Sequence, residues 1–259
     1  VYPIPESNGI DKAVLDQYGA GMSDFEKECA KTQLEMLIDK FKDAKEYGAI
    51  LNVDECNWEL LHDFINARGE LAQLDYMLYE ADKAAEPLHR IVIVAEILAR
   101  KYDVVVTNPP YMGSSNMNVT LGQYIKKYYT DYKSDFFSAF IIRASYMTKT
   151  NGYCGFFSPY VWMFIKSYEA LRNYLYNNAT IETLIQFEYS AFEEATVPVC
   201  TFVFQNRRVK KSGCYIRLVD FRGGMEVQRQ KTLEAIADHN CGFYYEQNSD
   251  DFAKIPGSP

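Results

Sequence analysis

Hydrophobic positions in the first part of the chain recur at helical spacing. Between Ser23 and Tyr47 the apolar side chains lie three or four positions apart, which is typical of one face of a helix. They are Phe25, Leu34, Leu37, Ile38, Phe41 and Ala44. Ser23 and Glu26 have the spacing of a capping box, so the helix is predicted to begin there. Further helices are predicted over 58–78 and 87–100, which makes residues 1–100 a helical region.

The pattern changes after this region. Tyr102–Thr107 is a short run of β-branched residues and predicts a buried strand that stops at the prolines 109 and 110. Later apolar runs predict helices over 134–148 and 167–177, and strands over 153–158, 181–187, 199–205 and 215–219. Strands that alternate with helices predict an α/β sheet, with a hairpin near its end at the charged turn 206–211.

The sequence Asn108-Pro109-Pro110-Tyr111 is the candidate chemical site. Two prolines end a strand sharply, because proline lacks an amide N–H and moves the residue before it out of the helical region. In open α/β sheets, ligands bind at the edge where the strands end. Asn108 offers a side-chain acceptor and donor, Pro109 a backbone carbonyl and Tyr111 a flat face. These groups can hold a planar ring that carries an amine; a Pro-Pro turn that only ends the strand is the structural alternative.

The segment 102–113 resembles motif IV of the amino-methyltransferases, which act on planar amines such as adenine N6 and cytosine N4. The resemblance continues in order through 135–140, 149–159 and 192–204. Two further segments, 41–48 and 215–221, resemble the large adenine-specific methyltransferases of the BREX phage-defence systems. Type II restriction-modification methylases share the same motif.

This resemblance implies a fold class and a domain organisation. The fold is α/β: a partial, Rossmann-like class I methyltransferase sheet, its C-terminal half ending in a hairpin, preceded by a helical region. Residues 1–100 would be the helical region, 101–206 the catalytic core, and 207–259 the start of a connection to a target-recognition domain. The chain begins with Val1 rather than Met, and we expect it to be an internal piece of a longer polypeptide.

The resemblance also implies an activity: transfer of a methyl group from S-adenosyl-L-methionine to adenine N6 in DNA, for restriction-modification or phage defence. The Asn108 side-chain oxygen and the Pro109 carbonyl would accept the two N6 hydrogens. Tyr111 and Phe192 would stack on the target adenine, flipped out of double-stranded DNA. Asn108, Pro110 and Phe140 would contact the cofactor.

A methyltransferase of this kind also needs a glycine-rich turn between a strand and a helix. Gly19 and Gly21 superficially offer one. Their spacing from Asp16 is one residue short of the usual pattern, and Ser23 opens a polar-faced helix rather than a buried one. A lone pair of glycines is weak evidence. We therefore expect the fragment to lack the cofactor loop and to be inactive alone.

Composition sets limits on these interpretations. At 259 residues and 48% hydrophobic content the chain can bury a substantial core, and it has no apolar run of the ~18 residues that a membrane span requires. The net charge of −8 disfavours a large phosphate-binding surface. A cluster of basic residues could form a DNA-facing edge, although a solvated turn is the favoured interpretation. The cluster comprises Arg207, Arg208, Lys210, Lys211, Arg217 and Arg222.

Cysteine and histidine positions argue against a metal site. The six cysteines include no C-x-x-C pair and are predicted to be reduced thiols in the core. His62, His89 and His239 have no partners at metal-ligand or triad spacing and are predicted to be structural. The implied partners are double-stranded DNA and other restriction or BREX defence subunits, with no membrane and a cytoplasmic location.

Two other functions stay open at this point. The same tetrapeptide occurs in enzymes that methylate protein glutamine or RNA guanine N2. The chain could also be a non-catalytic scaffold or interaction piece of a defence complex.

Overall fold

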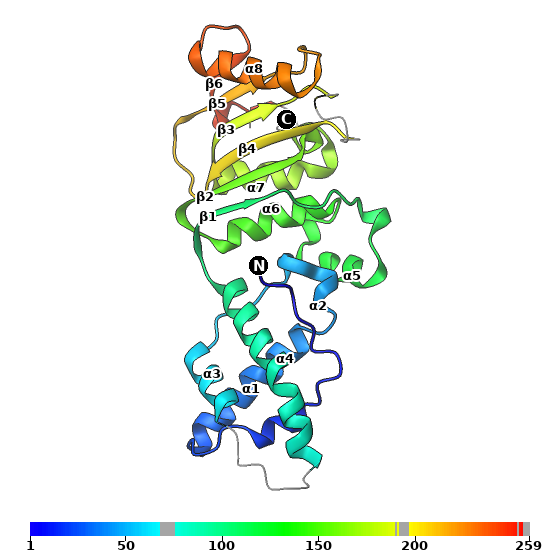
Figure 1. Ribbon diagram of the computed structural model, residues 1–259. Helices are drawn as coiled ribbons and strands as arrows, with labels where there is room; N and C mark the ends of the chain where they lie inside the picture. The colour runs from blue at the N-terminus through cyan, green and yellow to red at the C-terminus, as the bar shows by residue number, and fades with distance from the viewer. Residues whose placement is uncertain (68–75, 190, 192–196, 253, 256–259) are drawn as a thin grey trace. The chain divides into compact units, whose positions relative to one another are not determined.

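A computed structural model describes residues 1–67, 76–189, 191, 197–252 and 254–255 (Figure 1). The chain forms two compact units, Val1–Arg100 and Lys101–Pro259. Within the described residues, no helix combines the length and the apolar character needed to cross a bilayer.

The first unit is helical, as predicted. Its elements are η1 (Lys12–Gln17), α1 (Asp24–Lys40), α2 (Ala44–Tyr47), η2 (Gly48–Ile50), α3 (Trp58–Asn66) and α4 (Tyr76–Ala99). The capping box is present: the Glu26 amide donates to Ser23 Oγ, and the Ser23 amide donates to the Glu26 carboxylate. The predicted helix is interrupted between α1 and α2, where Asp43 has a left-handed φ of 56°. The predicted apolar face is buried except for Phe25, which is 78% exposed.

Pro87 lies inside α4 and does not begin a helix, so the predicted boundary at this residue is wrong. Proline removes one N–H from the helical hydrogen bonds, which normally ends or kinks a helix. Leu88, Ile91 and Ala95 follow it at helical spacing and are each 0% exposed. Their burial stabilises the helix by ~25 cal/mol per Å² of apolar surface and offsets the cost of the proline.

The second unit is an α/β sheet with helices on both faces. Its strands are β1 (Tyr102–Thr107), β2 (Thr148–Pro159), β3 (Thr180–Gln186), β4 (Val199–Gln205), β5 (Ser212–Arg217) and β6 (Tyr244–Asn248). Its longer helices are α5 (Val119–Tyr128), α6 (Phe136–Met147), α7 (Glu169–Asn178) and α8 (Gly224–Ala237). Shorter helices are η3 (Ser114–Asn116), η4 (Thr130–Tyr132), η5 (Tyr160–Met163), η6 (Lys166–Tyr168) and α9 (Ser249–Phe252).

The strand order is β1-β2-β4-β3-β5-β6 (Figure 1). β1 and β2 are parallel, β4 runs antiparallel to both of its neighbours, and β3 and β5 are parallel. Strands β1, β2, β3 and β5 therefore all end at one edge of the sheet, which we call the carboxyl edge; the opposite edge is the amino edge. The predicted α/β class is confirmed, and the antiparallel pair β3 and β4 supplies a hairpin. Residues from 207 onward contribute strands β5 and β6 to the same sheet, and helix α8 lies between these two strands in the chain.

The charged turn 206–211 is not a hairpin turn. It leaves β4 but leads to β5, which lies on the far side of β3 and pairs with β3 in parallel. The strand predicted over 215–219 is present as β5, but it begins earlier, at Ser212, and ends earlier, at Arg217. The local sequence indicates a turn correctly, but it cannot indicate which strand the chain will join.

β1 is a strand, as predicted, but it is not buried. Val104 is 58% exposed and Val106 is 73% exposed. Val104 and Val106 lie two positions apart and project onto the same face of the sheet, and β1 is the first strand in the sheet order, with only β2 beside it among the described strands. A β-branched run predicts a strand well, whereas burial depends on neighbours that the run does not specify.

Candidate functional site

The tetrapeptide Asn108–Tyr111 follows directly after β1, at the carboxyl edge. Pro109 is buried, while Asn108, Pro110 and Tyr111 are exposed. The buried proline fixes the backbone at the point where the strand stops, because its ring locks φ. The chain therefore presents the Asn108 carboxamide and the Tyr111 ring from a rigid base.

The Tyr111 hydroxyl lies between two acceptors. Its oxygen is 2.9 Å from Asn108 Oδ1 and 3.2 Å from the carbonyl oxygen of Phe157, which belongs to β2. Burial, followed by the nearby Cys200 thiol, raises the pKa of Tyr111 to about 12. The phenol consequently remains protonated, and a hydrogen-bond donor, at neutral pH.

Asp135 fastens the segment after the tetrapeptide to the start of α6. Its Oδ1 accepts from the Met112 amide at 3.0 Å and from the Phe137 amide at 3.3 Å. The Phe136 amide donates back to the Met112 carbonyl at 2.9 Å. Burial raises the pKa of the Asp135 carboxyl, and the backbone amides that bond to it oppose that shift. The carboxylate thus acts both as the N-cap of α6 and as a clamp on the chain that follows Tyr111.

A second set of contacts holds the loop after β2 at the same edge. The Ser114 amide donates to the Ser134 carbonyl, and Ser134 Oγ donates to the Ser167 carbonyl. Arg172 on α7 is 1% exposed and donates to the carbonyls of Trp162 and Ile165 at 2.7 and 2.8 Å. Sequence reasoning missed these positioning residues, because a serine or an arginine alone carries no signal for them.

Of the two other aromatic residues predicted for the site, the structure describes Phe140 but not Phe192. Phe140 lies one helical turn beyond Phe136 on α6, is partly buried and packs edge-to-face on the Phe136 ring at 4.9 Å between centroids. Since the Phe136 amide is bonded to Met112, Phe140 lies ~6 Å along the helix from that junction. Phe192 lies outside the described residues.

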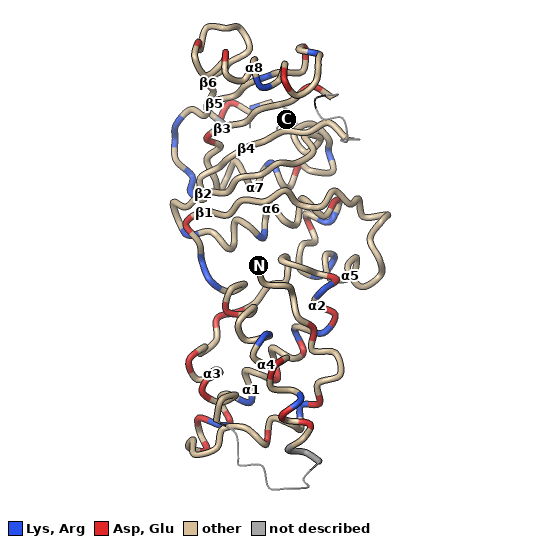
Figure 2. The backbone as a smooth tube through the Cα atoms, viewed as in Figure 1, with Lys and Arg blue, Asp and Glu red and all other residues tan. Residues whose placement is uncertain are grey.

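The six basic residues of the predicted cluster do not form one surface. The turn that carries residues 207–211 follows the end of β4 and lies at the amino edge (Figure 2). The Val209 amide there donates to Thr180 Oγ1 at the start of β3. Arg217 ends β5, at the carboxyl edge, and Arg222 is exposed in the connection from β5 to α8. Of the six residues in this cluster, only Arg217 and Arg222 thus lie near the carboxyl edge, which also carries Asn108.

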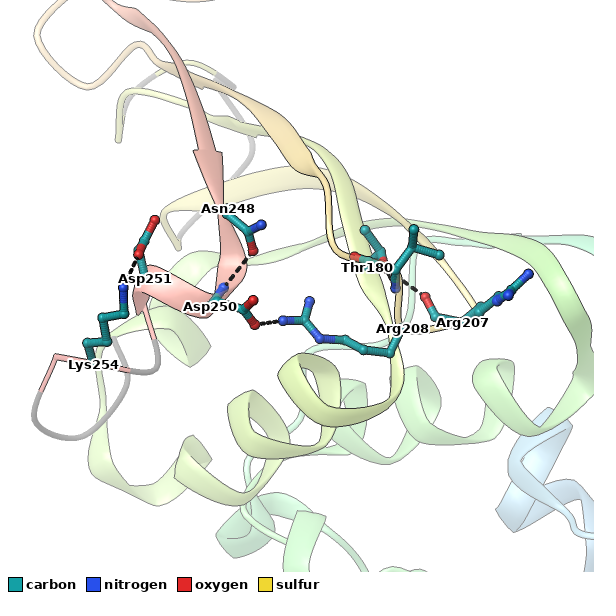
Figure 3. Close-up of polar contacts among 8 residues, drawn as sticks. Thr180, Arg207, Arg208, Asn248, Asp250, Asp251 and Lys254 are labelled. Carbon is teal, nitrogen blue, oxygen red and sulfur yellow. Dashed lines mark hydrogen bonds and ion pairs between the residues drawn. The ribbon is translucent and has the colours of Figure 1, made fainter.

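Acidic and polar groups pair with most of the basic turn. Figure 3 shows Arg208 in an ion pair with Asp250. Lys211 pairs with Glu182 at 2.6 Å, and Arg207 donates to Asn151 Oδ1 at 3.0 Å. These pairs lower the positive potential of the turn, which explains how it coexists with an acidic chain.

Gly19 and Gly21 lie in the helical unit, after η1 and before α1. Both have a positive φ, 76° and 79°. A Cβ at Gly19 would come within 2.8 Å of the Phe64 ring, so packing against α3 explains the glycine there. A phosphate- or cofactor-binding glycine loop of an α/β sheet has to follow a strand. The turn at Gly19 and Gly21 follows the helix η1 instead.

Two of the histidines have structural partners. His62 Nε2 lies 3.5 Å from Glu96, and the His239 ring stacks on Tyr244 at 4.0 Å. All six cysteines are free thiols; Cys154 and Cys200 are buried and the other four are partly buried.

Comparison with known protein families shows which family the chain belongs to. The model of the Eco57I restriction-modification methylases matches residues 15–192. The chain belongs to the Eco57I restriction-modification methylase family. The match includes the helical unit from residue 15 onward as well as the tetrapeptide at the end of β1, so the resemblance stated for the large adenine-specific methyltransferases is confirmed.

Individual members show how much of the family is represented. The adenine-specific methyltransferase PglX of Lacticaseibacillus casei (strain Zhang) is 32% identical over 229 residues, which cover 86% of this chain and 19% of PglX. The adenine-specific methyltransferase BrxX of Escherichia coli O9:H4 (strain HS) is 36% identical over 222 residues, or 85% of this chain and 18% of BrxX. The chain therefore spans less than a fifth of these relatives.

A solved structure is also similar. The type I restriction-modification methyltransferase subunit from Streptococcus thermophilus aligns over 66% of this chain and 44% of its own, with 15% identity and a TM-score of 0.45. A likeness of this size adds nothing to the functional assignment of an Eco57I-type methylase.

Proposed function

We propose that this chain carries the base-binding half of an S-adenosylmethionine-dependent DNA adenine N6-methyltransferase of a restriction-modification or phage-defence system. The observation that carries the proposal is the Asn108–Tyr111 tetrapeptide, rigidly presented at the carboxyl edge of an Eco57I-family sheet. The adenine-specific relatives support the choice of base.

Adenine N6 is a poor nucleophile because its lone pair is conjugated with the ring. The Asn108 side-chain oxygen and the Pro109 carbonyl accept the two N6 hydrogens and draw the nitrogen towards a pyramidal form. The lone pair is then localised on nitrogen. This mechanism depends on positioned dipoles rather than on a general base, and the buried Pro109 keeps one of them fixed.

The base has to leave the duplex to reach this edge, and aromatic side chains hold it once it is flipped. Tyr111 is 37% exposed, so its ring is accessible to an incoming base while its hydroxyl is bonded to the protein. Phe192 would supply the opposite face.

The cofactor supplies an electrophilic methyl group on a sulfonium. Asn108, Pro110 and Phe140 would contact it. The position of Phe140 fits a contact with the cofactor. Phe140 is partly buried on α6, and the bond between Met112 and Asp135 joins the start of this helix to the segment that follows the tetrapeptide. The proposed organisation has the helical region 1–100, the core 101–206 and, over 207–259, the start of a connection to a target-recognition domain, a segment that also supplies β5 and β6 to the sheet. The proposed location is the cytoplasm, and the proposed partners are double-stranded DNA and defence subunits.

One experiment separates this proposal from its alternatives. The full-length protein is incubated with S-adenosylmethionine carrying a labelled methyl group and with duplex DNA, RNA or a glutamine-containing protein, and the modified residue is identified by mass spectrometry. N6-methyladenine in the duplex supports the proposal. Label in guanine N2 or in glutamine would identify one of the other amino-methyltransferases, and no label on any substrate would favour a scaffold.

A further inference from the structure

The Tyr111 hydroxyl has one proton and two acceptors within hydrogen-bond distance. Asn108 Oδ1 is at 2.9 Å and the Phe157 carbonyl oxygen is at 3.2 Å. A hydroxyl donates one full hydrogen bond at a time, and it can accept from a donor as well. As long as Asn108 turns its oxygen towards Tyr111, one of the two lone pairs of that oxygen is already engaged by a protein donor.

Rotation of the Asn108 carboxamide by half a turn gives a different set of bonds. The NH₂ group then occupies the position 2.9 Å from the Tyr111 hydroxyl and donates to it. The hydroxyl proton passes to the Phe157 carbonyl, which β2 holds in place. This chain of donors and acceptors satisfies all three groups, and the Asn108 oxygen points away from Tyr111.

We propose that the Tyr111 hydroxyl is a positioning group that turns the Asn108 oxygen towards the substrate amine. The inference rests on the proposed function and assigns Tyr111 a second task besides stacking. The ring holds the base, while the hydroxyl, fixed by the Phe157 carbonyl, selects the carboxamide orientation that can accept an N6 hydrogen. Since the phenol remains protonated at neutral pH, the selection operates throughout the physiological range.

The two tasks are separated by comparing Tyr111→Phe with Tyr111→Ala in the full-length protein. Base capture is followed by the fluorescence of 2-aminopurine placed at the mapped target position, and chemistry by single-turnover methylation. Tyr111→Phe should keep base capture within about twofold, because the ring remains, and slow methylation about tenfold, because one orienting hydrogen bond is lost. Tyr111→Ala should weaken capture about tenfold or more. Tyr153→Phe removes an exposed hydroxyl near the amino edge and is the matched control.

Methylation by Tyr111→Phe at the unaltered rate would overturn the inference. A neutron crystal structure of this variant locates the carboxamide hydrogens and so distinguishes the oxygen from the NH₂ group, which provides a readout that does not depend on the reaction. The Asn108 carboxamide should adopt a new orientation or several, whereas an unchanged orientation would also overturn the inference. If the unmodified protein methylates no duplex adenine, the proposed function fails, and the carboxamide orientation alone then decides whether Tyr111 positions Asn108.

Discussion

At the scale of single residues, the tetrapeptide combines a fixed backbone with side chains that are free to meet a ligand. Pro109 is buried, but Asn108 and Tyr111 are exposed. An exposed asparagine contributes little to folding, since water can replace its partners. Its substitution can therefore report on chemistry without the loss of structure that follows from changing a core residue.

We expect Asn108→Ala to lower the single-turnover methylation rate of the full-length protein by ~10²-fold or more, because one of two preorganised acceptors for the amine is lost. The thermal unfolding midpoint should stay close to that of the unmodified protein. Asn116→Ala, which removes another exposed asparagine from the following segment, should leave the rate unchanged. A normal rate in Asn108→Ala would contradict the proposed mechanism.

At the scale of elements, the start of α6 determines where the tetrapeptide is held. Asp135 is the N-cap of α6 and bonds to Met112 as well. One side chain therefore connects a helix end to the candidate site.

Replacing Asp135 by Ala should lower the free energy of unfolding by ~1 to 2 kcal/mol, the usual cost of losing an N-cap. Asp135→Asn keeps an oxygen that can accept from the same amides and should cost only a few tenths of that. Urea unfolding followed by circular dichroism measures both. Equal destabilisation by the two variants would show that the charge, rather than the acceptor geometry, matters.

The stability of the protein should also depend on pH through Asp135. Burial raises the pKa of this carboxyl in the folded state, so the folded protein keeps the proton to a higher pH than the unfolded chain. The folded state binds more protons in this window, and its stability falls as pH rises through it. Relative to Asp135→Asn, which does not titrate there, the unmodified protein should be most stable at the acid end of the carboxyl range. Urea midpoints across that range test the sign; a difference that grows with rising pH would contradict it.

Local signals predicted the elements that depend on local interactions. The capping box at Ser23 and Glu26 is one example, and the strand that ends at Asn108 is another. The sequence did not predict α5, α8 or β6. α8 begins at two glycines with positive φ, Gly223 at its N-cap and Gly224 at its first position, and only Gln228 and Ala235 are buried in it, so it shows almost no apolar face. The insertion of β4 between β2 and β3 depends on tertiary pairing and has no local signature.

The candidate site was predictable in part for the same reason. The chemistry of Asn108 and Tyr111 can be inferred from their residue types after a strand that ends in two prolines. The bond from Tyr111 to the Phe157 carbonyl spans 46 positions and could not be inferred, because it exists only once β1 and β2 are paired.

At the scale of the whole molecule, charge is divided between the two edges of the sheet. With a net charge of −8, any approach to DNA depends on where the basic side chains lie. Those of the 206–211 turn lie at the amino edge and are largely paired, while Arg222 lies at the carboxyl edge.

We expect Arg222→Gln to reduce the slope of log K against log salt for duplex binding by about one, the effect of losing one phosphate contact. Lys210→Gln removes the same charge from an exposed position at the amino edge and should leave the slope unchanged. Fluorescence anisotropy of a labelled duplex at several salt concentrations provides the measurement. A larger effect of Lys210→Gln would place DNA at the other edge.

The 259-residue chain by itself should bind S-adenosylmethionine very weakly and methylate nothing. Gly19 and Gly21 pack in the helical unit, which leaves Asn108, Pro110 and Phe140 as the proposed contacts. Hydrogen bonds to a charged acceptor contribute ~1.5 to 3 kcal/mol each, and each ~1.4 kcal/mol changes affinity tenfold. The resemblance also implies an acidic residue that binds the cofactor ribose at the end of a second strand, and no described strand precedes β1 to supply it. The chain should therefore have a dissociation constant towards the millimolar range in titration calorimetry. A low micromolar value would mean that the Gly19 turn binds cofactor after all.

The exposure of β1 has a consequence for the tendency of the protein to aggregate. No described strand covers its outer side, and Val104 and Val106 give it an apolar surface. An edge strand of β-branched residues whose outer side has no partner strand is a template for edge-to-edge aggregation. The ion pair between Lys149 and Asp103 places charge near the start of the strand, but the valines beyond it have no such protection. We therefore expect edge-to-edge association of this protein, where it occurs, to begin at β1.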